Sequence, residues 1–168
     1  VWNRRQRLAK GGGLSVARLE HLLGRYGSLV TEVLEAVRER PDLAQGLGGA
    51  DDYLRAEVVY ATTHEGARHL EDVIARRTRI SIEAWDRGES AAPIAAKLMA
   101  AVLGWDQETT EPEVSNYLTR VAAEPDSPLP PADPTAPRVR LPAPAIASRP
   151  PADHVVAGAR PPRRPQGP

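Results

Sequence analysis

The stretch HEGARHLEDVIARRTRI, residues 64–80, combines a helical spacing of apolar side chains with a dense group of charges. Leu70, Val73 and Ile74 recur at i, i+3 and i+4, which places all three on one face of an α-helix. We therefore expect a helix over about residues 65–78, with this apolar face buried.

The same apolar spacing recurs on both sides of this stretch and predicts five further short helices. They are expected at residues 15–27, 30–37, 52–63, 93–104 and 110–121. The segment 52–63 has an alternative, because the adjacent Val58, Val59 and Tyr60 would also suit a strand.

Polar residues and glycines mark the ends of several predicted helices. Ser15 is placed to cap the first helix, and Gly27 to end it in the left-handed conformation. Gly104 is expected to close the fifth helix in the same way. Thr110 and Glu113 match a capping box at the start of the last helix.

The connections between the predicted helices are short. Ile80 and Ile82, which follow the central helix, alternate with polar neighbours and predict a short extended segment. The predicted fold class is all-α, a compact bundle of about six short helices with a Pro-rich C-terminal tail.

The composition changes sharply after the last predicted helix, and this change predicts a domain boundary. Fourteen of the 17 prolines lie from Pro125 onward, where few large apolar side chains remain to offset the entropy of an ordered chain. We expect a disordered tail at residues 124–168 and a helical domain at residues 14–123. Because the chain starts at Val1 rather than methionine, residues 1–13 are interpreted as a linker from an upstream domain.

The overall composition argues against several classes of protein. Basic and acidic side chains balance at 22 each, so no net field draws the chain to nucleic acid, and we expect no such partner. No cysteine is present, which excludes disulfides and thiolate metal sites. No apolar run is long enough to span a membrane, so we expect a cytoplasmic protein without a membrane span.

His64, Glu65 and His69 look at first like the start of a metal-binding helix. A zinc-protease helix carries its two histidines at i and i+4, so that both reach one ion. Here the histidines are five residues apart, which separates them by roughly 140° around a helix axis. We interpret them as two partly exposed histidines near helix ends and predict no metal site.

Patterns of other catalytic sites are not found. The sequence contains no G-x-S-x-G turn for a nucleophilic serine. The run Gly11 to Gly13 matches no phosphate-binding loop and is interpreted as a flexible joint. We predict no catalytic and no cofactor-binding residue in this chain.

The charged residues at the end of the central helix are the most informative local feature. Asp72 is spaced for an i, i+4 ion pair with Arg76. One further turn of the apolar stripe reaches Arg77, where a buried guanidinium would need a carboxylate or carbonyl partner. We interpret Asp72, Arg76, Arg77 and Arg79 as candidates for contact with another domain. Direct contact with an anionic substrate and a basic nucleic-acid patch are the alternatives.

Three segments closely resemble the C-terminal helical domain of bacterial FAD-dependent glycerol-3-phosphate dehydrogenase, particularly its actinobacterial forms. They are RYGSLVTEVL (25–34), LRAEVVYATTHEGARHLEDVIARRTRISIE (54–83) and LMAAVLGWD (98–106). The resemblance extends from about Trp2 to Ala123, and the run at 72–79 is its most specific part.

The resemblance implies a role within a larger oxidoreductase. Enzymes of this family oxidise sn-glycerol 3-phosphate to dihydroxyacetone phosphate, pass electrons through FAD to quinone, and associate peripherally with the cytoplasmic membrane. Their FAD-binding and catalytic residues belong to an N-terminal region, so none is carried onto this chain. The resemblance therefore implies an accessory fragment that binds no FAD and is inactive alone, with the flavin and cap region as its partner.

Two alternatives to the accessory domain remain, a stand-alone helical module and an autonomous enzyme that would use His64, Glu65 and His69. The chain could be a stand-alone helical module for protein interaction, for which we expect a fully polar surface. The run RPPRRP at residues 160–165 could be a polyproline ligand.

Overall fold

The computed structural model describes residue 9 and residues 13–123. The predicted disordered tail at 124–168 lies outside the described residues, as does most of the predicted linker at 1–13. Within the described residues the fold has six α-helices, labelled α2 to α7, and one two-stranded sheet. The helices are α2 (Val16–Tyr26), α3 (Val30–Glu39), α4 (Arg55–Thr63), α5 (Ile80–Glu83), α6 (Ala92–Leu103) and α7 (Gln107–Ala123).

The first two helices form as their sequence predicts. The Ser15 side chain accepts a hydrogen bond from the Arg18 amide at 3.2 Å, and Gly27 ends α2 with φ of 55°. A short 3-10 turn, Gly27–Leu29, leads into α3, which ends before Pro41. Both helices bury the apolar stripe that identified them.

A β-hairpin that the sequence did not predict precedes α4. Strands β1 (Gly46–Leu47) and β2 (Ala50–Leu54) pair antiparallel, with Leu47 opposite Ala50 across a Gly-Gly turn. Helix α4 therefore begins at Arg55, and the predicted start at residue 52 is wrong. Glu57 explains the new start, because its carboxylate accepts the Leu54 amide at 2.9 Å and caps the helix there.

The central stretch is helical, but the predicted α-helix over 65–78 is wrong in both extent and type. Residues 64–69 form an irregular connection, and Asp72 accepts the amides of Arg68 and His69, each at 3.0 Å. The segment η4 (Asp72–Arg77) is a π-helix, whose wider turn brings the Thr78 amide to the Val73 carbonyl, five residues back, at 2.9 Å.

The predicted extended segment at Ile80 and Ile82 is also wrong. Arg79 adopts a left-handed conformation with φ of 65°, which ends η4 and redirects the chain. The next residues form one helical turn, α5, in which Ile80 is buried and Ile82 is exposed. An extended segment would place Ile80 and Ile82 on the same face, but local hydrogen bonds form a helical turn that buries Ile80 and exposes Ile82.

The last two helices form a packed pair. Helix α6 has Pro93 in its first turn and ends at Gly104, with φ of 69°, as predicted. Helix α7 begins three residues earlier than predicted, because Asp106 accepts the Thr109 amide at 2.9 Å. The predicted capping box of Thr110 and Glu113 is therefore wrong.

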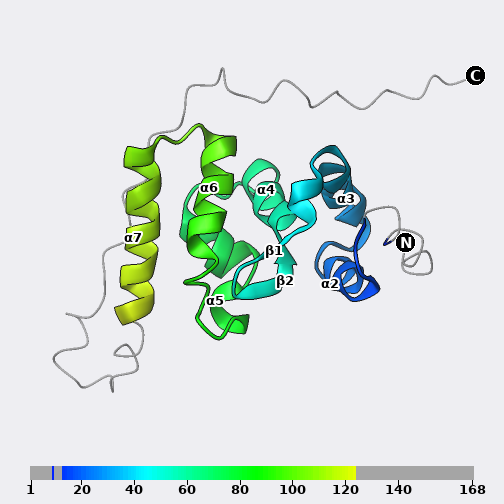
Figure 1. The fold of residues 1–168 in the computed structure, drawn as a ribbon, viewed down its shortest axis with the longest axis horizontal. Coiled ribbons are helices and arrows are strands. Elements are labelled where there is room, and N and C mark those ends of the chain that lie inside the picture. The colour runs from blue at the N-terminus through cyan, green and yellow to red at the C-terminus, as the bar shows by residue number, and fades with distance from the viewer. Residues whose placement is uncertain (1–8, 10–12, 124–168) are drawn as a thin grey trace, which may run out of the picture.

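The buried apolar side chains form two clusters that meet at α4. One cluster holds the inner faces of α2 and α3, and the other holds η4, α6 and α7. Helix α4 contributes to both, with Tyr60 in the first cluster and Val58 in the second. In Figure 1, α2 and α3 lie at one end of the molecule, α7 at the other, and α4 between them. The predicted helical fold class is confirmed, with the hairpin as an addition.

Candidate functional site

The four residues predicted to contact another domain lie in or directly after η4. Asp72 and Arg76 form the predicted ion pair, and Arg76 Nη2 lies 3.2 Å from Glu71 Oε1. Glu71 in turn lies 2.7 Å from Arg120 on α7. These charges form a surface network that ties η4 to α7, so Asp72 and Arg76 already have partners within the chain.

Arg77 does not extend the buried stripe, and this prediction is wrong. Its side chain is exposed, and Thr78 occupies the buried position instead, with no exposed surface. The π-helical turn causes the change, because the residue that follows Val73 on the same face is five positions on rather than four. Within the described residues, the Arg77 guanidinium makes no hydrogen bond or ion pair.

Two large apolar side chains accompany these arginines. Arg79 Nε lies 3.6 Å from Glu83 Oε1, and the Arg79 side chain is 62% exposed. Ile82, one helical turn later, is 71% exposed, and Trp85 is fully exposed. We call Arg77, Arg79, Ile82 and Trp85 the docking surface. Sequence reasoning missed the two apolar members, although an isoleucine and a tryptophan in a polar segment were a usable signal.

Sequence reasoning also missed a cluster of ionisable groups around Glu57, which is completely buried. The Glu57 carboxylate lies 3.0 Å from Arg25 Nε and accepts a hydrogen bond from Tyr26 Oη at 3.3 Å. His21 Nε2 lies 3.6 Å from the same carboxylate. Nothing in the sequence around Glu57 marks it as buried, because the groups that neutralise it come from α2.

Arg25 connects this buried cluster to the docking surface. It donates through Nη1 to the Thr78 carbonyl at 3.0 Å and through Nη2 to the Arg77 carbonyl. Its guanidinium also lies 5.2 Å from the centre of the Tyr53 ring. One side chain therefore holds both the carboxylate of α4 and the C-terminal end of η4.

The electrostatics of the cluster favour neutral tyrosines beside a charged pair. Burial raises the pKa of Tyr26 well above its usual value, and the charge of Glu57 raises it further. Burial also raises the pKa of Tyr53, and its hydrogen bond to Glu83 adds to this. Burial alone would lower the pKa of Arg25, but the Glu57 carboxylate together with Tyr26 and Tyr53 outweighs it and leaves that pKa raised. The raised pKa values keep Tyr26 and Tyr53 neutral and Arg25 charged at neutral pH.

The structure separates the residues of the apparent metal motif. His64 stacks on Tyr60, with ring centres 4.5 Å apart, whereas His69 Nδ1 lies 2.8 Å from Glu113 Oε1. Glu113 also accepts the Leu70 amide at 2.8 Å, so it joins α7 to the start of the central helix. Among residues 9 and 13–123, no group of three or more possible metal ligands is present.

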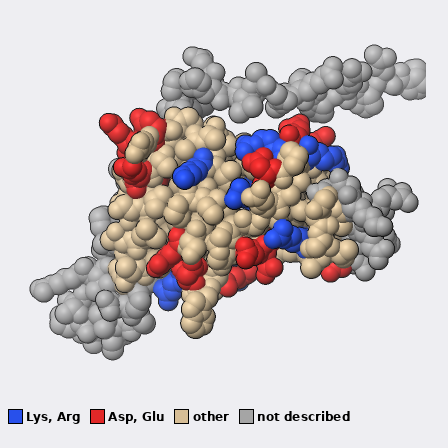
Figure 2. Space-filling model, viewed as in Figure 1, with Lys and Arg blue, Asp and Glu red and all other residues tan. Residues whose placement is uncertain are grey.

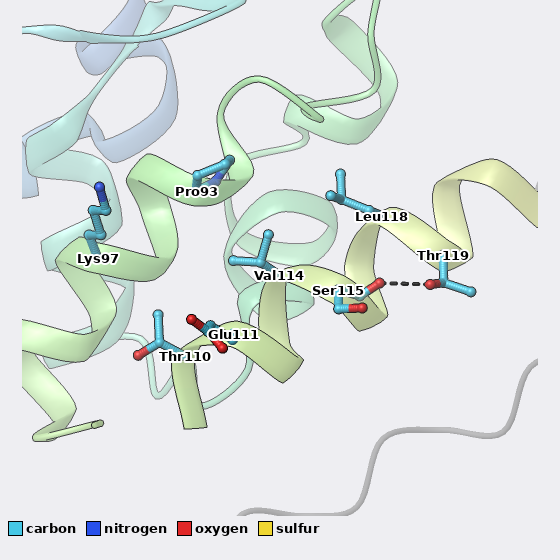
Figure 3. A pocket seen from close by; sticks show the side chains of 8 residues that line it. All are labelled: Pro93, Lys97, Thr110, Glu111, Val114, Ser115, Leu118 and Thr119. Atoms are coloured by element: carbon cyan, nitrogen blue, oxygen red, sulfur yellow. Dashed lines mark hydrogen bonds between the residues drawn. The ribbon is translucent and has the colours of Figure 1, made fainter. Parts of the chain in front are cut away.

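One shallow groove lies between α6 and α7 (Figure 3). Val114 and Leu118 of α7 and Pro93 of α6 supply its apolar lining, and Lys97 and Glu111 lie at its edge. Its polar residues are exposed or only partly buried and make no convergent arrangement. The groove has no geometry for catalysis.

The described residues do not fit a flavin. A dinucleotide-binding fold places pyrophosphate at a glycine-rich turn between a parallel strand and a helix. The sheet formed by residues 46–54 is instead a two-stranded antiparallel hairpin.

Among the described residues, no helix is long and apolar enough to cross a membrane.

Charge on the surface is mixed. Figure 2 shows lysines and arginines scattered among acidic side chains, without a broad basic patch on the face in view. This distribution gives no support on that face for the alternative of nucleic-acid binding.

Comparison with known proteins connects this fold to a family. The family described as the C-terminal domain of alpha-glycerophosphate oxidase matches residues 1–110. The chain is 44% identical over 142 residues to "Glycerol-3-phosphate dehydrogenase" of Mycobacterium leprae, covering 84% of this chain and 24% of that protein. It is 46% identical over 132 residues to "Glycerol-3-phosphate dehydrogenase 2" of Mycobacterium tuberculosis, covering 79% of this chain and 23% of that protein.

A eukaryotic relative is more distant. "Probable glycerol-3-phosphate dehydrogenase, mitochondrial" of Dictyostelium discoideum is 34% identical over 111 residues, covering 66% of this chain and 17% of that protein. No solved structure matches the chain significantly. The chain spans about a quarter of the length of its mycobacterial relatives. It belongs to the family of the C-terminal domain of alpha-glycerophosphate oxidase, which occurs in glycerol-3-phosphate dehydrogenases.

Proposed function

We propose that this chain acts as the helical accessory domain of an FAD-dependent glycerol-3-phosphate dehydrogenase. The whole enzyme would oxidise sn-glycerol 3-phosphate to dihydroxyacetone phosphate and pass electrons to quinone at the cytoplasmic membrane. Residues 14–123 would form the domain, and residues 1–13 would link it to the flavin-binding region. Support comes from the 44–46% identity to mycobacterial proteins that carry this enzyme's name.

In this proposal the chain contributes packing rather than chemistry. Its described residues do not form a dinucleotide-binding fold, so no reaction step is assigned to them. FAD, glycerol 3-phosphate and quinone would all bind to the flavin and cap region. The accessory domain would pack against that region and hold the active site in its working shape.

The observation that carries this role is the docking surface. Arg77 is exposed without a partner among the described residues, and Ile82 and Trp85 expose large apolar side chains. A stand-alone module that is stable as a monomer would be expected to carry a polar surface here, so this arrangement favours the accessory domain. Asp72 and Arg76 would lie at the edge of the contact and support η4.

Reconstitution tests the proposal. The chain is mixed with the separately produced flavin-binding region of the Mycobacterium leprae relative, and glycerol-3-phosphate-dependent dye reduction is followed together with flavin absorbance. We expect the chain alone to be inactive and the mixture to exceed the flavin-binding region alone.

An Arg77→Ala, Arg79→Ala variant should lose this gain. Arg38→Ala, at an exposed position on α3, is the matched control and should keep it. The proposal is wrong if a flavin-binding region that is folded by circular dichroism and retains its flavin neither binds the chain nor gains activity from it.

A further inference from the structure

Trp85 is exposed to an extent that needs an explanation. Among the described residues, four large apolar side chains are exposed: Val16 at 39%, Leu29 at 49%, Ile82 at 71% and Trp85 at 101%. The two most exposed of these lie three positions apart in the sequence. Tryptophan is enriched among the residues that dominate binding energy at protein interfaces. The position is therefore a candidate contact point for another protein.

The backbone that carries Trp85 is fixed. The Arg87 amide donates to the Ala84 carbonyl at 3.0 Å, which closes a turn with Trp85 and Asp86 at its centre. The Asp86 carboxylate accepts the amides of Gly88 at 3.0 Å and Ser90 at 2.9 Å. The turn is therefore held by its own hydrogen bonds, even though its tryptophan is exposed.

The turn is also anchored to the core. Tyr117 of α7 donates through its hydroxyl to the Arg87 carbonyl at 2.6 Å. Gly88 has φ of 85°, and a Cβ at that position would come within 2.9 Å of Ile74 and Ile80. Because the backbone is already ordered, little further conformational entropy would be lost when Trp85 is buried by a partner.

The charges around the turn indicate what kind of partner it fits. Residues 77–89 carry three arginines and three acidic side chains, so the segment has no net charge to attract an anionic membrane. Two of the acids are already engaged: Glu83 accepts from Tyr53, and Asp86 accepts backbone amides. Arg77 has no such partner within the described residues. A fitting partner would therefore offer carboxylates to the arginines and an apolar cavity to Trp85. A folded protein can supply both.

We propose that Trp85 is the anchor of the docking surface and inserts into an apolar pocket on the flavin-binding region of the enzyme, with Arg77 and Arg79 pairing with carboxylates at the rim. The inference rests on the proposed function and names the residues that contact the flavin-binding region. Ile82, three residues before Trp85 and 71% exposed, adds to the apolar part of the interface. The turn's anchor points, Asp86 and Tyr117, set the direction in which Trp85 projects.

Binding measurements with the full 168-residue chain test the anchor. The chain is titrated with the flavin-loaded region of the Mycobacterium leprae relative by calorimetry. Trp85→Ala is expected to weaken binding by at least about tenfold, whereas Leu29→Ala, another exposed apolar position, should change it by less than about twofold. The melting temperature of Trp85→Ala should match that of the parent chain, because the fully exposed side chain supports no packing in the free chain.

The outcomes separate the anchor from the proposed function. If the parent chain binds and Trp85→Ala binds equally well, the anchor assignment is wrong and the proposed function stands. If the parent chain does not bind at all, both are wrong. Trp85-dependent sedimentation with phosphatidylserine vesicles, or Trp85-dependent dimerisation in the ultracentrifuge without binding to the flavin-binding region, would overturn the proposal in favour of a lipid surface or a second copy.

Discussion

The Glu57 cluster and the docking surface use the same kinds of side chain for opposite purposes. Arg25 is 18% exposed, and its Nε lies 3.0 Å from Glu57, which is completely buried. Arg77 is exposed and makes no such contact within the described residues. The type of residue does not distinguish a stabilising arginine from one available for recognition. The distinction comes from whether neighbouring helices enclose the guanidinium and supply its counter-ion.

The two regions are also physically connected. Arg25 donates to the carbonyls of Arg77 and Thr78, so the buried pair holds the backbone from which the docking surface projects. If enclosure by neighbouring helices makes this difference, substitutions at Glu57 should lower the free energy of unfolding. Substitutions of exposed charged residues should leave it nearly unchanged.

The largest effect is expected for Glu57→Gln. The substitution keeps the shape but leaves the guanidinium of Arg25 without its buried counter-charge, which costs about 3 kcal/mol in the free energy of unfolding. Urea denaturation followed by circular dichroism measures it. Glu35→Gln, at an exposed position on α3, is the control and should cost less than about 0.5 kcal/mol. Equal losses in the two variants would remove the distinction between the regions.

A smaller loss is expected for Glu113→Ala. Glu113 accepts from the Leu70 amide and pairs with His69, so its removal leaves a helix start without its acceptor. We expect a loss of about 1–2 kcal/mol, together with faster hydrogen exchange at the Leu70 amide. Glu111→Ala, which loses only an exposed contact with Gln107, should change neither quantity appreciably. Unchanged exchange at Leu70 in Glu113→Ala would contradict this role.

Alkaline pH should gradually lower the free energy of unfolding of the chain. Tyrosines in the unfolded chain lose their protons near pH 10, whereas burial raises the pKa of Tyr26, Tyr53 and Tyr60 in the folded state, that of Tyr60 to about 12. Above about pH 10 the folded chain therefore holds more protons than the unfolded chain, and stability falls as pH rises. Denaturation series between about pH 8 and about pH 10.5 should show this decline, and Tyr60→Phe should reduce its slope. A free energy of unfolding that is constant over this range would disprove it.

The smallest effect is expected for Arg76→Ala. Arg76 is 59% exposed and pairs with Asp72 and Glu71 at the surface, where ion pairs contribute little. The free energy of unfolding should change by less than about 0.5 kcal/mol. Thermal denaturation of both chains, at low and at high salt, measures this change. A loss as large as that of Glu57→Gln would show that the surface network, rather than the buried cluster, supports η4.

Local sequence was sufficient for the helices that carry their own boundary signals. Helices α2, α3 and α6 begin and end near the predicted residues, because caps, glycines and proline act on the adjacent backbone. Helix α7 was predicted with the wrong start, since Asp106 offered a competing cap four residues before Thr110. The predicted apolar stripes are buried in α2 and α3. In α6 the buried face is formed by Ala95, Ala96, Met99 and Leu103, and Ile94, Leu98 and Val102 are only partly buried.

The candidate site was only partly predictable. The charged run at η4 was recognised, and the pair of Asp72 and Arg76 is present. The exposure of Arg77 was not foreseen, because an α-helical repeat was assumed where the chain forms a π-helical turn. Trp85 and Ile82 were not assigned, because their solvent exposure depends on how α5 packs.

By itself, the sequence determined the helical class, the positions of the strongly amphipathic helices and the resemblance to glycerol-3-phosphate dehydrogenases. These depend on spacing and caps within a few residues, and on identity along the chain. Only the tertiary structure decided that Glu57 is buried, that Glu113 joins two helices and that Trp85 is exposed. The partners of Glu57 and Glu113 lie 31 and 44 residues away in the sequence, and only folding brings such distant atoms together.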